Sequence, residues 1–92
     1  VRDARPNPSP ALAAALCTAG DRAATSGHAS GAFALHLLCY QLAIRHGWPD
    51  AGARAARAIA WLAEAGGGRW SVKRWHRRAN VLARRAARQS DD

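Results

Sequence analysis

Residues Phe33–Arg45 read FALHLLCYQLAIR, and this stretch decides the predicted fold. At about 100° per residue on a helical wheel, its large apolar side chains fall on two nearly opposite sides of one helix. The two sets are Phe33, Leu37, Tyr40 and Ile44 on one side, and Leu35, Leu38 and Leu42 on the other. A helix with two apolar sides needs two sets of neighbours. The pattern therefore predicts an all-α fold, a small three- to four-helix bundle with this two-faced apolar helix at its centre.

Length and composition agree with a helical domain. The chain has 92 residues, enough for one domain with a single small core. Alanine, arginine and leucine are frequent, whereas β-branched and aromatic residues are few, a balance that favours helices over sheets. We expect a flexible N-terminal arm at residues 1–8, a single helical domain at residues 9–89 and an acidic end at residues 90–92.

The first helix is predicted to begin at Ser9, a good N-cap, with Pro10 in the first turn, where its missing N–H costs nothing. It is expected to end near Ala19, with Gly20 as the residue after its C-terminus. Residues 20–31 contain three glycines and two serines, so they are predicted to form a loop.

The central helix is expected to start at Ser30, with Ser26 as a competing cap, and to end at Gly47. A third helix is predicted for Asp50–Ala65, with its start at Asp50 or Pro49. Three successive glycines at residues 66–68 stop this third helix.

The final helix is predicted for Ser71–Gln89, with Ser71 as its N-cap. Its apolar residues keep a heptad spacing, so one narrow seam is expected to pack on the bundle while both flanks stay exposed. The seam consists of Val72, Trp75, Ala79, Leu82 and Ala86.

The positive charge is concentrated in this last quarter of the chain, which makes the C-terminal helix basic. Residues 1–68 hold six arginines against four acidic residues, a net charge of +2, whereas residues 69–92 hold eight basic residues against two acidic ones, a net charge of +6. No acidic residue lies between Glu64 and Asp91, so no i,i+4 ion pair within the last helix can neutralise its charge. Such a helix indicates a polyanionic partner, with nucleic acid as the first choice.

We therefore predict that the last helix binds the phosphate backbone of DNA or RNA with little sequence specificity and a strong dependence on salt. Its cationic side chains contact phosphates, and Trp70 offers a surface on which an unpaired base can stack. The predicted nucleic-acid-binding residues are Arg69, Lys73, Arg74, Arg77, Arg78, Arg84, Arg85, Arg88, Trp70 and Asn80.

Three further patterns bear on this prediction. Trp61 is a second candidate for base stacking, and Arg57, four residues before it, is placed for a cation–π pair with it. The glycines at 66–68 precede a helix start and suit one phosphate contact, although their spacing is not that of a nucleotide-hydrolysis motif. A helix-turn-helix, in which Asn80 addresses an adenine edge, is a less favoured alternative because the glycine-rich connection is loose.

No pattern for catalysis or for a cofactor accompanies the charge. His36 and Cys39 share one strip of the central helix, but two ligands do not make a zinc site, and an interior histidine is the simpler interpretation. Asp21, Ser26 and His28 have no elbow motif or oxyanion element around them. We predict a non-enzymatic protein without a metal or a cofactor.

Two other functions fit parts of the sequence. The first is a helical protein–protein interaction or oligomerisation domain of a larger protein, suggested by the small residues of the third helix; a subunit of a larger nucleoprotein assembly is an intermediate case. The second is a secreted, membrane-active basic peptide, for which the narrow, alanine-rich seam is poorly suited. No stretch approaches the ~20 apolar residues of a membrane span, so integral membrane association is not expected.

Cys17 and Cys39 are the only cysteines, and they do not form a C-x-x-C pair. Two buried thiols in a reducing cytoplasm are the simplest interpretation. A disulfide between the first and the central helix is the alternative.

Overall fold

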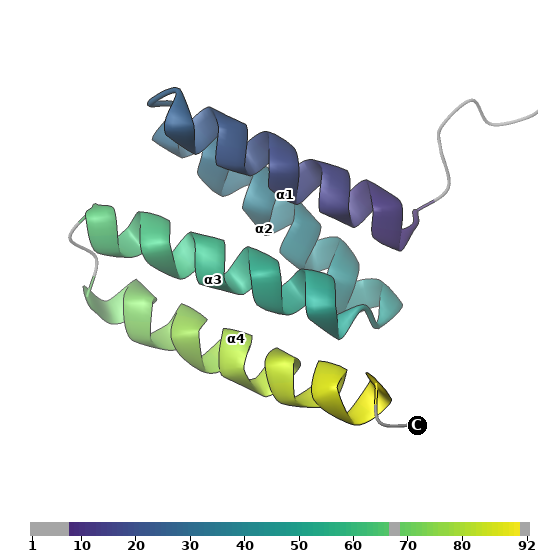
Figure 1. Cartoon of the computed structure of the whole chain (residues 1–92). Helices are drawn as coiled ribbons and strands as arrows, with labels where there is room; N and C mark the ends of the chain where they lie inside the picture. Colours follow the sequence, from purple (N-terminus) through teal and green to yellow (C-terminus); the bar gives the residue numbers. More distant parts are fainter. Residues whose placement is uncertain (1–7, 67–68, 91–92) are drawn as a thin grey trace, which may run out of the picture.

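The computed structural model describes residues 8–66 and 69–90, and the secondary structure in this part of the chain is entirely α-helical. The four helices are α1 (Pro10–Thr25), α2 (Ala29–His46), α3 (Pro49–Ala65) and α4 (Arg69–Ser90). Short connections join them, and successive helices run in opposite directions (Figure 1). The predicted all-α bundle is confirmed.

Parts of the predicted domain plan lie outside the described residues. The predicted N-terminal arm does so except for Pro8, and so do residues 67–68 and residues 91–92. The side chains of residues 69–71 and of residue 90 are outside them as well.

α1 begins as its sequence predicts. Ser9 is the N-cap, and its Oγ accepts a hydrogen bond from the backbone N–H of Leu12 at 3.1 Å. Pro10 occupies the first helical turn. A side-chain oxygen that satisfies one of the free N–H groups at a helix start stabilises the helix by about 1 kcal/mol.

α1 continues through Gly20 to Thr25, so the prediction that Gly20 follows the end of the helix is wrong. Gly20 is buried against α2, and the imidazole of His36 lies over it. A Cβ atom on Gly20 would stand 2.6 Å from Nε2 of His36. Close approach between two helices, rather than a left-handed C-cap conformation, is therefore the reason for this glycine.

The longer α1 shortens the predicted loop at 20–31 to residues 26–28. Gly27 gives this turn its left-handed residue, with φ of 84°. Gly47 is the left-handed C-cap of α2, with φ of 75°, which confirms the predicted end of that helix.

The start of α2 differs from both predicted caps. The helix begins at Ala29, with His28 in the N-cap position and no side-chain hydrogen bond to the cap. Ser30 lies inside the helix, and Ser26 forms the C-cap of α1.

The strip of small and weakly polar residues on α2 faces the interior. Its members, all buried, are Ala32, His36, Cys39 and Ala43. The large apolar residues that remain partly exposed are Phe33 at 40%, Leu38 at 45% and Ile44 at 49%. The two apolar sides of α2 are thus less covered than predicted, because small side chains let the neighbouring helices approach along the strip and leave the larger ones at the rim.

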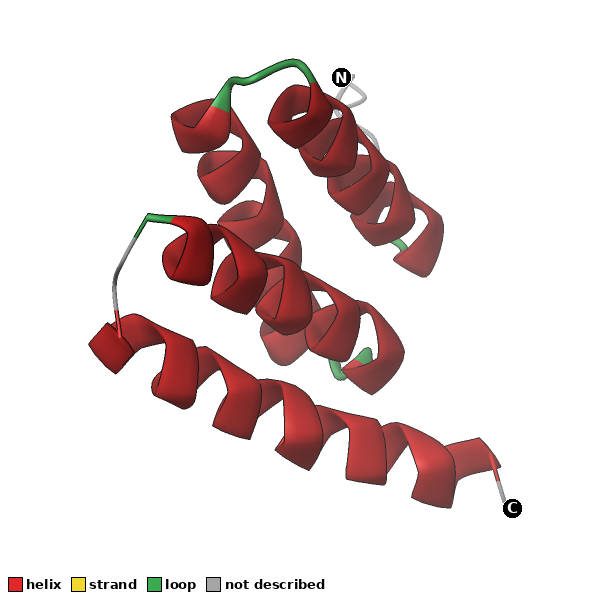
Figure 2. Cartoon of the chain, turned by 60° about the vertical axis from the view of Figure 1, so that its left-hand side comes forward, coloured by secondary structure: helices red, strands yellow, loops and turns green. Residues whose placement is uncertain are grey.

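α3 has more neighbours than any other described helix, since it packs against α1, α2 and α4. Its buried residues are small apart from one isoleucine: Gly52, Ala53, Ala55, Ala56, Ile59 and Ala60. α2 packs against α1 and α3, so the most central position belongs to α3 rather than to Phe33–Arg45. The result is a flat arrangement about 17 Å thick in its smallest dimension, with α4 at one edge (Figure 2).

The ends of α3 and α4 are close to the predicted ones. α3 starts at Pro49, and Gly66 is its C-cap. α4 starts at Arg69, two residues before the predicted cap Ser71, and ends at Ser90. Shifts of one or two residues are ordinary, since helix ends fray. The predicted phosphate contact at the glycines falls on residues 67–68, outside the described residues.

Replacing Gly20 with alanine is expected to destabilise the protein by roughly 1–3 kcal/mol, because the new Cβ meets the buried ring of His36. Gly31→Ala is the matched control. A Cβ there has no neighbour closer than 3.9 Å, and alanine favours the helix, so stability should rise by up to about 1 kcal/mol. Urea unfolding followed by circular dichroism measures both changes, and equal effects would show that α1 and α2 do not meet closely at Gly20.

Candidate functional site

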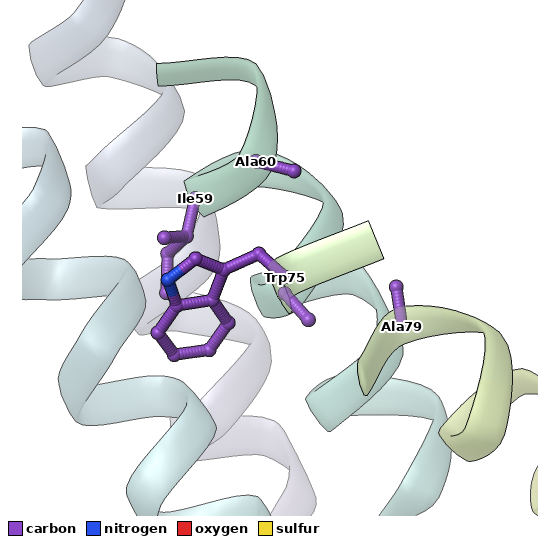
Figure 3. Close-up of a cluster of buried hydrophobic side chains, with 5 residues drawn as sticks. Ile59, Ala60, Trp75 and Ala79 are labelled. Atoms are coloured by element: carbon purple, nitrogen blue, oxygen red, sulfur yellow. The ribbon is translucent and has the colours of Figure 1, made fainter. Parts of the chain in front are cut away.

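α4 docks on α3 through its predicted seam. The fully or almost fully buried seam residues are Trp75, Ala79, Leu82 and Ala86. The indole of Trp75 lies against Ile59 of α3 (Figure 3) and meets the ring of Tyr40 of α2 edge-on, with the ring centroids 4.9 Å apart. Large aromatic side chains contribute most of the burial in so small a core. The seam prediction is confirmed, and the seam turns the rest of α4 outward.

Five predicted cationic residues form what we call the outer basic face of α4: Lys73, Arg77, Arg84, Arg85 and Arg88. On the helical wheel Lys73, Arg77, Arg84 and Arg88 lie opposite the seam and Arg85 lies on the flank beside them, so the five residues form one surface. All five side chains are exposed, and none forms an ion pair within the described residues. The described part of α4 contains no acidic residue.

The other predicted residues of α4 differ from these five. Arg74 and Asn80 are exposed on the same helix. Arg69 and Trp70 lie in its first turn, and their side chains lie outside the described residues.

Arg78 is the predicted binding residue with a clear structural contact. Its guanidinium carbon lies 4.6 Å from the centroid of the Trp75 ring and 5.8 Å from that of Tyr40, and the side chain is half-buried. A guanidinium over aromatic rings is stabilised by their quadrupoles, and its stem covers apolar surface. Arg78 therefore joins α4 to α2 and belongs to the edge of the core.

The exposed tryptophan of α3 is not beside the outer basic face. Trp61 is 61% exposed and lines a hollow with Asp21 and Thr25 of α1, on the other side of α3 from α4. Arg57 and Trp61 make no ring contact in the described structure, so the predicted cation–π pair between them is wrong. The sequence did not predict that Arg78 stacks on aromatic rings, because Trp75 was assigned to the seam and Tyr40 lies on another helix.

The helix-turn-helix alternative does not match the arrangement of α3 and α4. The two helices lie side by side along most of their lengths (Figures 1 and 2). A helix-turn-helix crosses its two helices at a wide angle, so that the second projects into a groove.

A partly buried polar cluster links α1, α2 and α3 away from the basic face. The sulfur atoms of Cys17 and Cys39 lie 3.0 Å apart, and both thiols are free and fully buried. Nε2 of His36 lies 3.3 Å from a carboxylate oxygen of Asp21. The second oxygen of this carboxylate accepts a hydrogen bond from Arg54 at 3.1 Å. The prediction of two buried thiols is confirmed, and the alternative disulfide is not formed.

The pKa values of the two thiols are shifted in opposite directions. The hydrogen bond between the two thiols lowers the pKa of Cys17 from 9.0 to about 5; burial opposes this change, and His36 and Arg54 support it. The same hydrogen bond, together with burial and the Cys17 charge, raises the pKa of Cys39. A thiolate is thus stabilised by a neighbouring thiol that keeps its proton.

This assignment predicts a specific effect of changing Cys39. Cys39→Ala removes the donor and should raise the pKa of Cys17, whereas Cys39→Ser keeps a hydroxyl donor and should leave it low. Titration of the thiolate by its ultraviolet absorbance measures both. Since the folded pKa of Cys17 lies below the unfolded value of 9.0, its stabilising contribution is complete above pH 9 and is lost as the pH falls to about 5. Identical titrations for the two variants would contradict the contact.

For Arg78, the structure predicts a loss of stability rather than a loss of ligand affinity. Arg78→Ala removes the contacts with Trp75 and Tyr40 and should cost about 0.5–2 kcal/mol. Arg77→Ala, on the exposed side of the same turn, is the control and should change the free energy of unfolding by less than about 0.5 kcal/mol. Chemical unfolding compares the two, and an equal effect would remove the structural role of Arg78.

Comparisons with protein-family models, with curated proteins and with solved structures give no match to this chain. Two further features are absent from the described residues. They contain no cluster of three or more histidine, cysteine or acidic residues placed to hold a metal ion. None of their helices has both the length and the hydropathy that crossing a bilayer requires.

Proposed function

We propose that this protein is a non-enzymatic nucleic-acid-binding module that holds the phosphate backbone of DNA or RNA along the outer basic face of α4. The observation that carries the proposal is the set of five exposed cationic side chains without an ion-pair partner in the described structure. Clustered Lys and Arg side chains that neutralise phosphates release counterions, and this release drives binding without reading sequence.

The dimensions of the face support a backbone ligand. Lys73 and Arg88 are fifteen residues apart on one helix, a separation of roughly 22 Å at a rise of 1.5 Å per residue. A strand of B-DNA carries one phosphate per 3.4 Å of helix axis, so this length corresponds to about six phosphates. Cationic side chains occur at both ends of the face and between them, which suits a continuous rather than a single anion.

The distribution of acidic residues also supports the proposal. Asp21 is engaged by His36 and Arg54 on the far side of α3. The other acidic residues of the described chain, Asp50 and Glu64, lie on α3. No described carboxylate therefore competes with a ligand for the outer basic face.

Backbone contact is favoured over base stacking. The described side chains of α4 include no exposed Trp, Tyr or Phe, because Trp75 is buried on the seam. Sequence-tolerant binding of single strands commonly uses exposed aromatic rings beside the charged groove. We further propose that the module works in a reducing cytoplasm, where Cys17 and Cys39 stay as thiols.

Titration against labelled single-stranded DNA, duplex DNA and RNA at several salt concentrations tests the proposal. The logarithm of affinity should fall steeply with the logarithm of salt concentration. Arg77→Ala and Arg84→Ala should each lower the magnitude of that slope by about one, since each removes one phosphate contact.

Arg22→Ala is the matched control, because Arg22 is an exposed arginine on α1, away from the outer basic face. It removes the same charge and should change the slope much less. No binding near physiological salt, or equal effects of Arg22→Ala and Arg84→Ala, would show that the outer basic face is not the binding surface.

A further inference from the structure

Two cysteines from different helices meet inside the bundle. The sulfur atoms of Cys17 on α1 and Cys39 on α2 lie 3.0 Å apart, and both side chains are fully buried. A disulfide bond joins two sulfur atoms at about 2.05 Å, so these two need to approach each other by only about 1 Å to be joined. Neither cysteine belongs to the outer basic face of α4, so the chemistry of this pair is separate from nucleic-acid binding.

The two thiols differ in acidity. Their hydrogen bond lowers the pKa of Cys17 to about 5, against the effect of burial and with support from His36 and Arg54, and it raises the pKa of Cys39. At pH 7 Cys17 is therefore mainly a thiolate, whereas Cys39 keeps its proton. The thiolate is the nucleophilic form of cysteine, and oxidised thiolates condense with a neighbouring thiol.

Cys17 forms part of the wall of a hollow of about 410 Å³. The hollow lies between the N-terminal half of α1, the turn that joins α2 to α3, and the end of α4, and Trp48, Pro49 and Arg54 also line it. Because Cys17 is 0% exposed, a reagent reaches its sulfur only when this wall opens slightly. That requirement favours a small oxidant over a bulky one such as oxidised glutathione.

We propose that Cys17 and Cys39 form a redox site, which hydrogen peroxide or another small hydroperoxide oxidises to a disulfide between α1 and α2. Cys17 is the attacking residue, and Cys39 is the resolving residue. Arg54 lies in the wall of the same hollow, and its positive charge favours both the Cys17 thiolate and the hydroxide that leaves.

The first step oxidises Cys17. Its sulfur attacks one oxygen of hydrogen peroxide, so that an S–O bond forms and the O–O bond breaks. The sulfur loses two electrons and becomes a sulfenic acid, while the peroxide is reduced. The second oxygen leaves as hydroxide, which takes a proton from solvent and becomes water.

The second step joins the two cysteines. The sulfur of Cys39 attacks the sulfur of Cys17, the S–S bond forms, and the S–O bond breaks. The hydroxide of the sulfenic acid leaves with the proton of Cys39 as a second molecule of water. With the two sulfur atoms already in contact, this step requires little movement of either helix.

Metal binding fits the pair less well than oxidation. Among the described residues, no third histidine, cysteine or carboxylate is placed with the two sulfur atoms to hold a metal ion. The side chains packed around the pair are mostly apolar, with Ala13, Ala55 and Leu16 among them. Oxidation needs only the two sulfur atoms and a small oxidant.

Oxidation of the reduced full chain by hydrogen peroxide at pH 7 tests the proposal. Samples taken over time are denatured in N-ethylmaleimide, which alkylates any remaining thiol, and their intact masses are measured. A monomer without alkylation and two hydrogens lighter than the reduced chain should accumulate. It should form about tenfold faster in the folded chain than in the chain unfolded in urea, because an unperturbed thiol is only a few per cent thiolate at pH 7.

Two substitutions test the roles of the cysteines. Cys39→Ser cannot close the disulfide, so a sulfenic acid on Cys17 should accumulate and react with dimedone once the chain is denatured. Cys17→Ser leaves only the less acidic Cys39, whose oxidation should be at least about tenfold slower. Circular dichroism confirms that both variants fold. Arg77→Ala, on the outer basic face, is the control and should oxidise like the wild type.

Four results would overturn the proposal. They are thiols that stay free after prolonged exposure to peroxide, faster oxidation in urea than in the folded state, a disulfide between two chains instead of within one, and faster oxidation of Cys17→Ser than of Cys39→Ser. A failure of the chain to bind nucleic acid would leave these measurements unaffected, because they use neither a nucleic acid nor the outer basic face.

Discussion

The structure depends on the small side chains of α3, which allow three helices to pack against one. Gly52 shows how close this packing is, since a Cβ there would stand 2.8 Å from a methyl group of Leu82. Alanines supply most of the remaining buried surface of α3, and Ile59 with Trp75 of α4 provides the bulk that fills the core. Because α3 takes the central position, α4 is placed at one edge of a flat bundle, and one side of α2 is left open.

This arrangement separates the two kinds of polar group in the protein. Asp21, His36, Arg54 and the thiols of Cys17 and Cys39 meet where α1, α2 and α3 come together. The Asp21 carboxylate pairs with the imidazole and the guanidinium, whereas Nδ1 of His36 is buried without a hydrogen-bond partner in the described structure. The five cationic side chains of the outer basic face are exposed to solvent and form no ion pair within the described residues. Mutual repulsion along the helix is small, a few tenths of a kcal/mol per pair, so the fold tolerates a charge that only an external anion would neutralise.

The proposed binding surface has simple physical requirements. The outer basic face needs many exposed charges at roughly regular spacing and little shape, because counterion release depends on the number of neutralised phosphates. Arg78 lies outside this surface, and its stacking on Trp75 and Tyr40 explains why an arginine of the basic helix contributes to the edge of the core.

The sequence by itself determined the helices, the seam of α4, the concentration of charge on its other side and the caps at Ser9 and Gly47, because these depend on periodicity and on local backbone chemistry. Tertiary structure decided the rest. From the local sequence, Gly20 is predicted to follow the end of a helix. In the structure it lies inside α1, and its lack of a side chain leaves room for His36 of α2. The large apolar residues of α2 were predicted to form the core, yet its strip of small residues is buried instead. Helices approach most closely where their side chains are smallest, and the position of this contact depends on the partner helix as well.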